Sequence, residues 1–354
     1  MWRVLDTGLR SAAQNIALDR ALLEARHAEE IPSTLRFCRF TPSVLLASRQ
    51  SPAQECDLDY CAAHDIAVQR RISGGETVYC DGAQLGWALY LHSREAAAGD
   101  MRAIARRICH AAAAAIGALG ADARFRAREH IEIDGRQIGS GGGTFDGNAV
   151  LYQGTLHFER DLKTMARATR TPAGGQFERA VAGLSQRVTG VTTLLGERGD
   201  AKLVRSNLIQ AFESEFDVEL HDGELSLSEH ARYQRAFVET DTPDWVNLLH
   251  EPASAISVHA AAQPVARGTL TANVLYEHAA RRIKQLWFTS DMPVAPLRGM
   301  LDLEAALSDT TVDRLERNVL AFFAAHGALR GVTAEHLIAV VRRALNLPLI
   351  ALKI

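Results

Sequence analysis

The chain has 354 residues, of which 47% are hydrophobic and 23% are charged, a globular composition in a length that suits two domains. Lys and Arg number 39 against 42 Asp and Glu, so the formal net charge is −3, and this balance argues against a nucleic-acid-binding protein, which usually has a basic surplus. No stretch of about 18 apolar residues exists and the N-terminal segment lacks an apolar run, so we expect neither a membrane span nor a signal peptide.

The elements expected in the first two thirds of the chain mix strands with helices. Residues 12–28 repeat apolar side chains at helical spacing, with Asn15 and Asp19 on the other face. The apolar runs 34–40 and 43–50, separated by Thr41-Pro42, are typical of a pair of adjacent strands. Further on we expect a helix over 57–66, a strand from 67 into a glycine turn, strands on both sides of Gly82, a helix over 101–116, a hairpin with an Asp-Gly turn over 130–140, a strand over 150–159 and mainly helix over 199–237.

The last third of the chain changes in character. Its first part is typical of a linker, residues 268–291 predict a hairpin of two strands, and helices follow from about Leu301. The pattern predicts an α+β fold in two domains. We expect a first domain with a mixed or antiparallel sheet and helices over 1–245, a linker over 246–261 and a smaller α+β domain over 262–354.

The five cysteines are odd in number and show no Cys-x-x-Cys spacing. This pattern indicates free thiols in a reducing compartment, without a disulfide framework or a zinc site. We therefore expect a cytoplasmic protein.

The segment 70–81, RRISGGETVYCD, joins two arginines to a glycine turn. Consecutive glycines let backbone N–H groups approach a ligand, and arginines add permanently charged donors for phosphate or carboxylate. The segment is not a Walker A loop, because no Lys-Ser/Thr follows, and it is not a dinucleotide-binding fingerprint, because its glycines open no clear helix. The alternative is a hairpin with a solvated arginine pair.

A second glycine-rich segment, GRQIGSGGGT at 135–144, predicts another turn at the end of a short strand. Two such turns in one domain favour a single ligand held from two sides, and the alternative is a flexible loop.

These segments together resemble the biotin/lipoate ligase superfamily, and most closely the lipoate–protein ligase A family. Residues 70–81 match its RRxSGGGxVxHD loop, residues 135–142 its GRKxSGSA-like segment, and Gln153-Gly154-Thr155-Leu156 its HGTL strand. The pair Arg49-Gln50, the SQRVT run at 185–189, the WFTSD run at 287–291 and the LEAAL helix are also similar to family segments. The resemblance implies a lipoate ligase-like catalytic domain followed by a C-terminal accessory domain.

The family resemblance also implies the site and its chemistry. Lipoate attacks the α-phosphate of ATP to give lipoyl-AMP, and a lysine of a small lipoyl-carrier domain then takes the lipoyl group. The implied cofactors are ATP and Mg²⁺, the implied partner is the carrier domain, and family members are commonly monomeric; no metal ligand is identified. The implied binding residues are Arg70, Arg71, Ser73, Gly74, Gly75, Thr77, Val78, Tyr79, Cys80, Asp81, Gln137, Gly139, Ser140, Gly141, Gly154 and Thr155, with Gln137 and Arg71 in the catalytic positions.

Three positions depart from the family pattern. Gln137 stands where the family has a lysine, Glu76 where it has the third glycine, and Cys80 where it has a histidine. Because a glutamine donates hydrogen bonds without charge, the loss of the lysine amounts to a few kcal/mol of transition-state stabilisation, or roughly two to three decades in rate.

These departures leave three interpretations open. The first is an active ligase in which Gln137 works with Arg136 or Arg71, and the second is a protein that binds lipoate or lipoyl-AMP but ligates poorly. The third is an octanoyltransferase with a cysteine nucleophile. Related transferases carry that cysteine just before the second glycine segment, where FRAREHIEI has none, and we expect Cys80 to be a small buried residue.

Four further residues lie near the motifs. His130 and His157 flank the second segment on strands; either could orient a ligand, although such lone histidines are usually structural or exposed. Trp87 is expected in the core, and Asp81 is expected either to cap the first turn or to reach a ribose.

Overall fold

A computed structural model describes residues 1–96, 101–126, 130–169, 177–248, 257–266, 268–292, 294 and 297–348, with the backbone alone for Arg102, Leu297 and Arg298. Residues 127–129 and 249–256, which belong to segments discussed above, lie outside the described residues. The chain forms two compact units. The first contains Met1–Leu46, Gln54–Ser73 and Thr77–Val246, and the second contains Ala47–Ala53, Gly74–Glu76 and Asn247–Ile354. None of the helices in these described ranges is long and apolar enough to cross a membrane.

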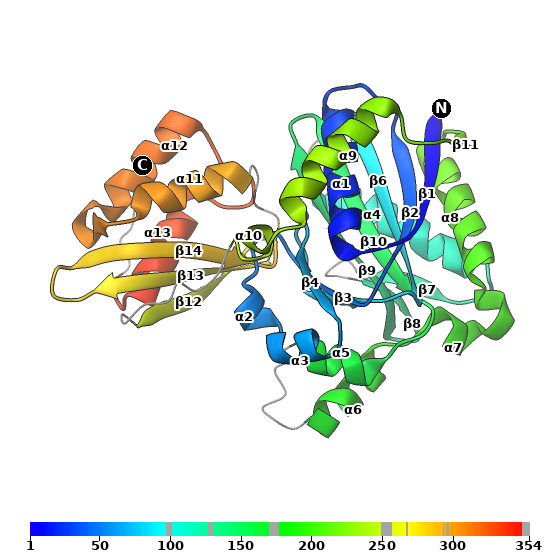
Figure 1. Ribbon diagram of the computed structural model, residues 1–354, viewed down its shortest axis with the longest axis horizontal. Coiled ribbons are helices and arrows are strands. Elements are labelled where there is room, and N and C mark those ends of the chain that lie inside the picture. Colours follow the sequence, from blue (N-terminus) through cyan, green and yellow to red (C-terminus); the bar gives the residue numbers. More distant parts are fainter. Residues whose placement is uncertain are drawn as a thin grey trace. The chain divides into compact units, whose positions relative to one another are not determined.

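The first unit is built on an eight-stranded mixed sheet in the order β11-β1-β2-β6-β10-β9-β8-β7 (Figure 1). β1 runs parallel to β2 and to β11, and the remaining pairs are antiparallel. The strands are β1 (Trp2–Arg10), β2 (Thr34–Phe40), β6 (Gln84–His92), β7 (Ala123–Arg126), β8 (His130–Ile133), β9 (Arg136–Asp146), β10 (Ala149–His157) and β11 (Leu220–Asp222). The fold is therefore α+β, as expected.

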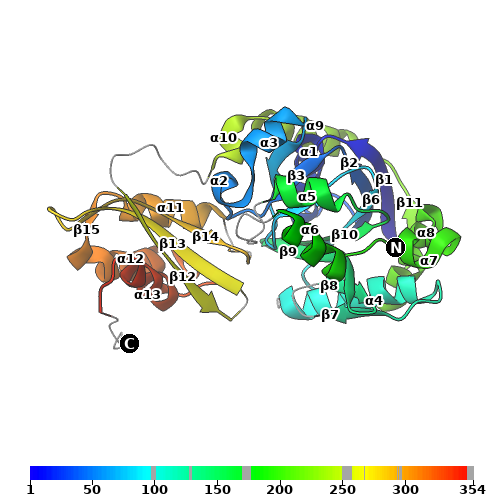
Figure 2. The ribbon, with the colours of Figure 1, turned by 90° about the horizontal axis from the view of Figure 1, so that it is seen from below.

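Helices cover both faces of this sheet (Figure 2). α4 (Met101–Gly117) and α8 (Ala201–Phe216) pack on one face over the main hydrophobic core, which includes Trp87 as expected. α1 (Ala12–His27) packs on the other face, and α9 (Leu227–Thr240) packs on α1. The other helices of the chain up to residue 246 are α2 (Pro52–Glu55), α3 (Leu58–Ala63), α5 (Leu162–Ala168), α6 (Phe177–Arg187), α7 (Val191–Leu195), the 3₁₀ helix η1 (Gly196–Gly199) and α10 (Pro243–Val246).

A second, three-stranded sheet corrects one expectation. β3 (Ser43–Leu46) pairs with β4 (Ala67–Arg70) and β5 (Val78–Cys80), whereas β2 lies in the large sheet, so residues 34–40 and 43–50 are not paired with each other. The reason lies at the corner between them. Thr41 N donates to Arg10 O at 3.0 Å as the last contact with β1, and Pro42 has no N–H with which to continue the ladder.

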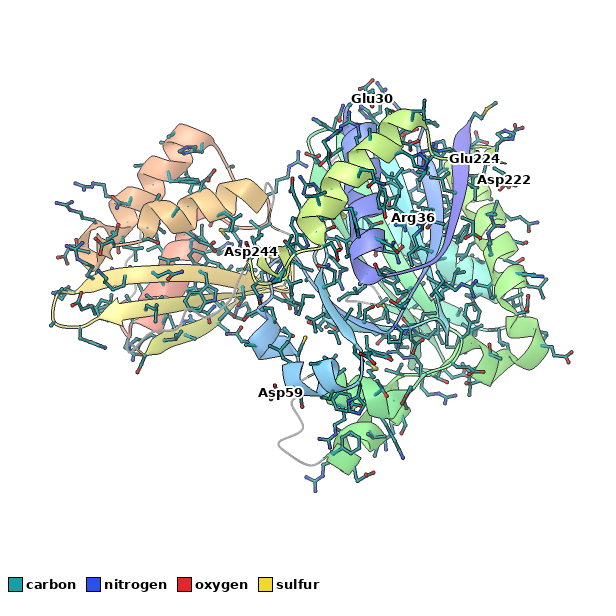
Figure 3. All side chains as sticks on the ribbon, in the orientation of Figure 1. Glu30, Arg36, Asp59, Asp222, Glu224 and Asp244 are labelled. Atoms are coloured by element: carbon teal, nitrogen blue, oxygen red, sulfur yellow. The ribbon has the colours of Figure 1, made fainter. Side chains whose placement is uncertain are left out.

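The two polar residues Asn15 and Asp19 of α1 are buried. The helix begins with a capping box between Ser11 and Gln14. Asn15 is fully buried and Asp19 is 4% exposed, because both bind the guanidinium of Arg36 from β2, with Arg36 Nη1 2.7 Å from Asp19 Oδ1. Arg36 is labelled in Figure 3. A buried ion pair therefore takes the place of solvent on this face.

The second glycine-rich segment is a strand and not a turn. The turn of this hairpin is Asp134-Gly135, with φ of 51° and 74°, as the Asp-Gly signal predicts, and the following glycines lie inside β9. They are required by close packing between strands. A Cβ atom at Gly139 would lie 2.4 Å from Thr155 O, and one at Gly154 would lie 2.4 Å from Trp87 Cζ2.

The second unit has a four-stranded antiparallel sheet in the order β12-β13-β14-β15, with three helices packed on one face around its own core. β12 begins within the segment expected to be a linker, and the expected two-stranded hairpin is part of this larger sheet. The elements are β12 (Val258–Val265), β13 (Gly268–Glu277), β14 (Arg282–Ser290), α11 (Leu297–Leu307), β15 (Thr310–Thr311), the 3₁₀ helix η2 (Val312–Arg314), α12 (Leu315–His326) and α13 (Ala334–Ala344).

Residues 47–53 and 74–76 join this second unit through specific contacts. Arg49 forms a buried ion pair with Glu304, and its Nη2 donates to Phe288 O at 2.6 Å. Ser290 N donates to Arg49 O at 2.9 Å, and Gly75 N donates to Asp291 O at 2.9 Å. The middle of the first glycine turn is thus anchored on the unit that contains β14.

Candidate functional site

The two glycine-rich segments are linked by a side chain that neither of them contains. Gln153 of β10 donates from Nε2 to the Oγ of Ser73 at 3.0 Å, and Ser73 is fully buried. On its own sheet Gln153 pairs with Gly142 of β9 and with Ala88 of β6. Ser73 of the first segment is therefore bound to β10, the strand that pairs with β9, where the second segment lies.

The polar residues of β9 and β10 share the face of the sheet that looks toward Ser73. Ser140 is opposite Thr155 across β9 and β10, and opposite His130 across β8 and β9. Gln137 is opposite Glu132, beyond an irregularity in the register. Because cross-strand partners lie on one face and side chains alternate along a strand, Gln137, Ser140 and Thr155 lie on the same face as Gln153.

The glycines of β9 and β10 have a different position. Gly139, Gly141 and Gly154 point toward the α4 and α8 core, where a Cβ atom at Gly141 would lie 2.7 Å from the Tyr152 hydroxyl. They make room for the large side chains beneath the sheet. The candidate site can use them only through their backbone.

The two arginines of the first segment diverge. Arg70 donates from Nε to Trp245 O at 3.2 Å and from Nη2 to Val246 O at 2.6 Å, and the Trp245 indole donates to Arg70 O at 3.0 Å. Arg71 donates from Nη1 to Leu45 O at 3.0 Å. Burial lowers the pKa of Arg71 to about 10, which keeps the guanidinium charged at neutral pH but makes a nearby anion favourable.

The rest of the first segment consists of β5 and the residues on either side of it. Thr77 Oγ1 donates to Glu55 Oε2 at 3.1 Å, and Asp81 Oδ1 accepts from Ala83 N at 2.9 Å and so caps the turn after β5. Val78 is partly buried on β5 and Tyr79 is 5% exposed, with a pKa raised to about 12, mainly by burial. Gly74 and Gly75 belong to the second unit.

None of the five cysteines is placed as an activated nucleophile. All are buried, and Cys80 is inaccessible, as expected for a small buried residue. Burial raises the pKa of Cys80 to about 12, although Arg160 and Arg71 lower it, and raises those of Cys38 and Cys61 to about 11. Because the thiolate is the reactive form, these thiols are protonated and unreactive at neutral pH.

Two residues at the end of β10 join the site although no motif singled them out as functional. Arg160 donates from Nη1 to Tyr79 O at 3.4 Å and approaches His157 Nδ1 at 3.3 Å. His157 is 3% exposed, and Leu156 beside it pairs with Gly139 of β9. The only sequence signal was their position directly after the Gln-Gly-Thr-Leu strand, and that position does not say where a side chain points.

Comparison with known proteins gives the family. The family model described as the lipoyl protein ligase A/B catalytic domain matches residues 11–213, more than half of the chain. The chain belongs to this family. The resemblance carried by the two glycine-rich segments is thereby confirmed.

Curated relatives have two kinds of names. Octanoyltransferase LipM of Moorella thermoacetica is 25% identical over 265 residues, which cover 69% of this chain and 97% of that protein. Lipoate-protein ligase LplJ of Bacillus subtilis is 22% identical over 196 residues, or 55% of this chain and 57% of that protein. The relatives of this chain therefore include proteins named as ligases and proteins named as octanoyltransferases.

Solved structures share the fold. A bi-partite lipoate protein ligase of Thermoplasma acidophilum, described together with its E2 lipoyl domain, has a TM-score of 0.62 at 23% identity and covers 71% of this chain and 98% of its own. A lipoate-protein ligase A bound with ATP has a TM-score of 0.62 at 22% identity, over 70% and 99%. The lipoate complex of P. falciparum LipL1 has a TM-score of 0.71 at 13% identity, over 98% and 99%.

Proposed function

We propose that the protein is an ATP-dependent lipoate–protein ligase that forms lipoyl-AMP and transfers the lipoyl group to a lysine of a carrier domain. The observation that carries this proposal is the kind of residues that the candidate site around Ser73 contains. It contains the buried cation Arg71 and the neutral donors of β9 and β10, whereas no cysteine of the chain is accessible as a nucleophile. Such a site suits an anionic intermediate better than an acyl-enzyme.

The proposed reaction proceeds in two displacements. A carboxylate oxygen of lipoate attacks the α-phosphorus of ATP and pyrophosphate leaves; the carrier's lysine amine then attacks the acyl carbonyl and AMP leaves with the electron pair of the broken C–O bond. Arg71 supplies positive charge beside the phosphoryl group, and Gln137 and Thr155 donate hydrogen bonds to oxygens that gain charge. Arg70 holds α10 against β4, so its role in the proposal is to position the segment.

Mg²⁺ fits this proposal as a cation brought by the nucleotide. Among the residues that the structure describes, no group of three or more His, Cys, Asp and Glu side chains could hold a metal ion. Mg²⁺ is usually bound through substrate phosphates with one or two carboxylates, and it would neutralise the departing pyrophosphate. Asp81, which is partly buried beside β5, is a carboxylate available for that purpose.

A second candidate function is octanoyl transfer, favoured by the LipM relatives that match over nearly their whole length. It needs a cysteine that forms a thioester, and Cys80 is the cysteine nearest the arginines of the site. The raised pKa of Cys80 and its burial disfavour this chemistry. The Cys80→Ala variant tests it, because octanoyl transfer that survives this change excludes Cys80 as the nucleophile.

Mass spectrometry of carrier domains distinguishes the candidates. The protein is incubated with a panel of lipoyl-carrier domains and either lipoate with Mg-ATP or an octanoylated acyl carrier without ATP. A lipoyl mass gain that requires ATP supports the ligase, and a gain from the octanoyl donor alone supports the transferase. Lipoyl-AMP that is bound or formed without any carrier gain supports a binding protein, and absence of all three products on every carrier overturns the ligase proposal.

A further inference from the structure

A buried part of the Arg160 guanidinium has no partner. Arg160 follows β10 and contacts Tyr79 O and His157 Nδ1 through Nη1, and the Met165 sulfur through Nη2 at 2.7 Å. Its Nε is buried without a hydrogen bond. Across the described ranges, no carboxylate lies within ion-pair distance of this side chain. A buried donor in this condition is unfavourable unless a ligand satisfies it.

Two other buried arginines of this chain differ from Arg160 in having a carboxylate partner, although Arg49 Nε and Nη1 also lack a hydrogen bond. Arg36 is paired with Asp19, and Arg49 is paired with Glu304. Each has a carboxylate supplied by the fold. Arg160 instead meets two neutral acceptors, a sulfur and a backbone carbonyl, together with a neutral imidazole.

His157 is oriented by Arg160 as a second donor. An arginine cannot accept a hydrogen bond, so Nδ1 of His157 is the acceptor and the ring proton lies on Nε2. Burial lowers the pKa of His157 well below 6.5, and the neighbouring Arg160 and His130 lower it further, so the ring is neutral at physiological pH. A neutral donor beside a fixed cation is suited to an anion.

Thr155 adds a third donor on the same face of β10. Its Oγ1 is buried and has no partner, and Thr155 pairs with Ser140 across the sheet. Thr155 and His157 lie two residues apart and therefore point to the same side. The donors of Arg160, His157 and Thr155 thus belong to one polar patch.

This patch lies beside the position where the family has its lysine. Leu156, next to His157, pairs with Gly139, two residues from Gln137. Thr189 N donates to Gln137 O at 2.9 Å. The adjacent Gly190 packs closely on the residue after β10, because a Cβ atom there would lie 2.0 Å from Phe158 O. Residues 189–190 therefore contact both the start of β9 and the end of β10.

We propose that Arg160 is the phosphate-binding cation of the site, with Thr155 and His157 as neutral donors, and that it supplies from the end of β10 the charge that Gln137 does not. This inference rests on the proposed adenylate chemistry and extends it. Arg160 is an addition to Arg71 and Arg136, the arginines adjacent to the motifs. The expected ligand is the α-phosphoryl group of ATP or of an acyl-adenylate.

Binding measurements on the full chain test the proposal. ATP, adenosine and a sulfamoyl analogue of lipoyl-AMP are titrated calorimetrically into the wild type, Arg160→Gln and Arg160→Lys, with Arg179→Gln on the exposed side of α6 as the matched control. Arg160→Gln is expected to weaken ATP binding roughly 10- to 100-fold, the scale for loss of a hydrogen bond to a charged group, and to leave adenosine binding unchanged. Arg160→Lys is expected to retain most of the affinity, and the control all of it.

The double variant Arg160→Gln/Gln137→Lys provides an independent readout. Restoring a cation at position 137 is expected to recover at least tenfold of the lost ATP affinity, whereas Gln137→Lys alone gains little because Arg160 is already there. Unchanged ATP affinity in Arg160→Gln overturns the proposal, and so does an equal loss for adenosine, which would identify a structural arginine. ATP binding that depends on Arg160 but gives no carrier modification refutes the ligase proposal alone. Carrier modification that is insensitive to Arg160→Gln refutes this inference alone. Absence of ATP binding by the wild type refutes both.

Discussion

Gln153 on β10 holds Ser73, the residue before the glycine pair of the first segment, through a hydrogen bond of 3.0 Å between Nε2 and Oγ. Gln153 is the first residue of the Gln-Gly-Thr-Leu run that resembles the family's HGTL strand. The bond connects a loop that follows a three-stranded sheet to the middle of an eight-stranded one.

Loss of this bond should affect ligand binding more than folding. In Gln153→Leu, a side chain of similar size leaves Ser73 Oγ without its donor, and we expect about 1 kcal/mol of lost stability and roughly tenfold weaker ATP binding. Ser73→Ala should have a similar effect, and the double variant should be little worse than either single one, because both remove the same interaction. Additive losses in calorimetric titrations of the four proteins would show that the two residues act independently.

The second prediction concerns position 137. Gln137 is partly buried on the face that contains Thr155 and Ser140, and its backbone is fixed by Thr189. If Arg160 supplies the charge of the site, Gln137→Lys places a second cation next to it, and lipoyl-AMP formation should change by less than about threefold, because the added attraction for phosphate is offset by repulsion between the cations. A gain of two decades or more in pyrophosphate release would instead identify a site degraded by loss of the lysine.

The motifs and the local elements could be predicted because they depend on neighbouring residues. The Asp134-Gly135 turn follows from the positive φ that this pair tolerates. The first helix follows from apolar spacing, and it begins at the Ser11 capping box. The ordered set of motifs, with the two glycine-rich segments at its centre, was enough to indicate the family. The roles of individual site residues stay predictions.

What the sequence did not predict depends on contacts between distant residues. The glycines of β9 suggested a turn, but they are required by Tyr152, Met101 and the β10 backbone, which approach from elsewhere in the chain. Apolar spacing put Asp19 on the face of the helix opposite the apolar residues, but it did not identify its buried partner, Arg36 of β2. Arg160 and His157 belong to no recognised pattern, since only the pairing of β10 with β9 and β6 brings them to the site.

The packing account of β9 and β10 gives a stability prediction. In Gly154→Ala the new methyl group would lie 2.4 Å from Trp87 Cζ2 and 3.0 Å from Ser140 O, and we expect a loss of about 1–3 kcal/mol in the free energy of unfolding. The matched control is Gly183→Ala in α6, where nothing lies within 4 Å and a helical alanine should stabilise by about 0.5–1 kcal/mol. Chemical denaturation of both variants measures the difference, and equal stabilities would refute the close-packing explanation.

His157 makes the stability of the protein depend on pH in a defined direction. Its pKa is well below 6.5 in the folded state, so below pH 6.5 the unfolded chain binds a proton that the folded chain does not. Stability from this group is therefore complete above pH 6.5 and decreases as the pH falls, by up to about 1.4 kcal/mol per pH unit until the folded-state pKa is reached.

The His157→Gln variant lacks this linkage, so its unfolding free energy should decline less than that of the wild type between pH 7.5 and 5.5. The exposed His230, changed to Gln, serves as the control and should follow the wild type. Parallel curves for the wild type and His157→Gln would mean that His157 is protonated without penalty in the folded protein, and would also remove the neutral donor from the proposed phosphate site.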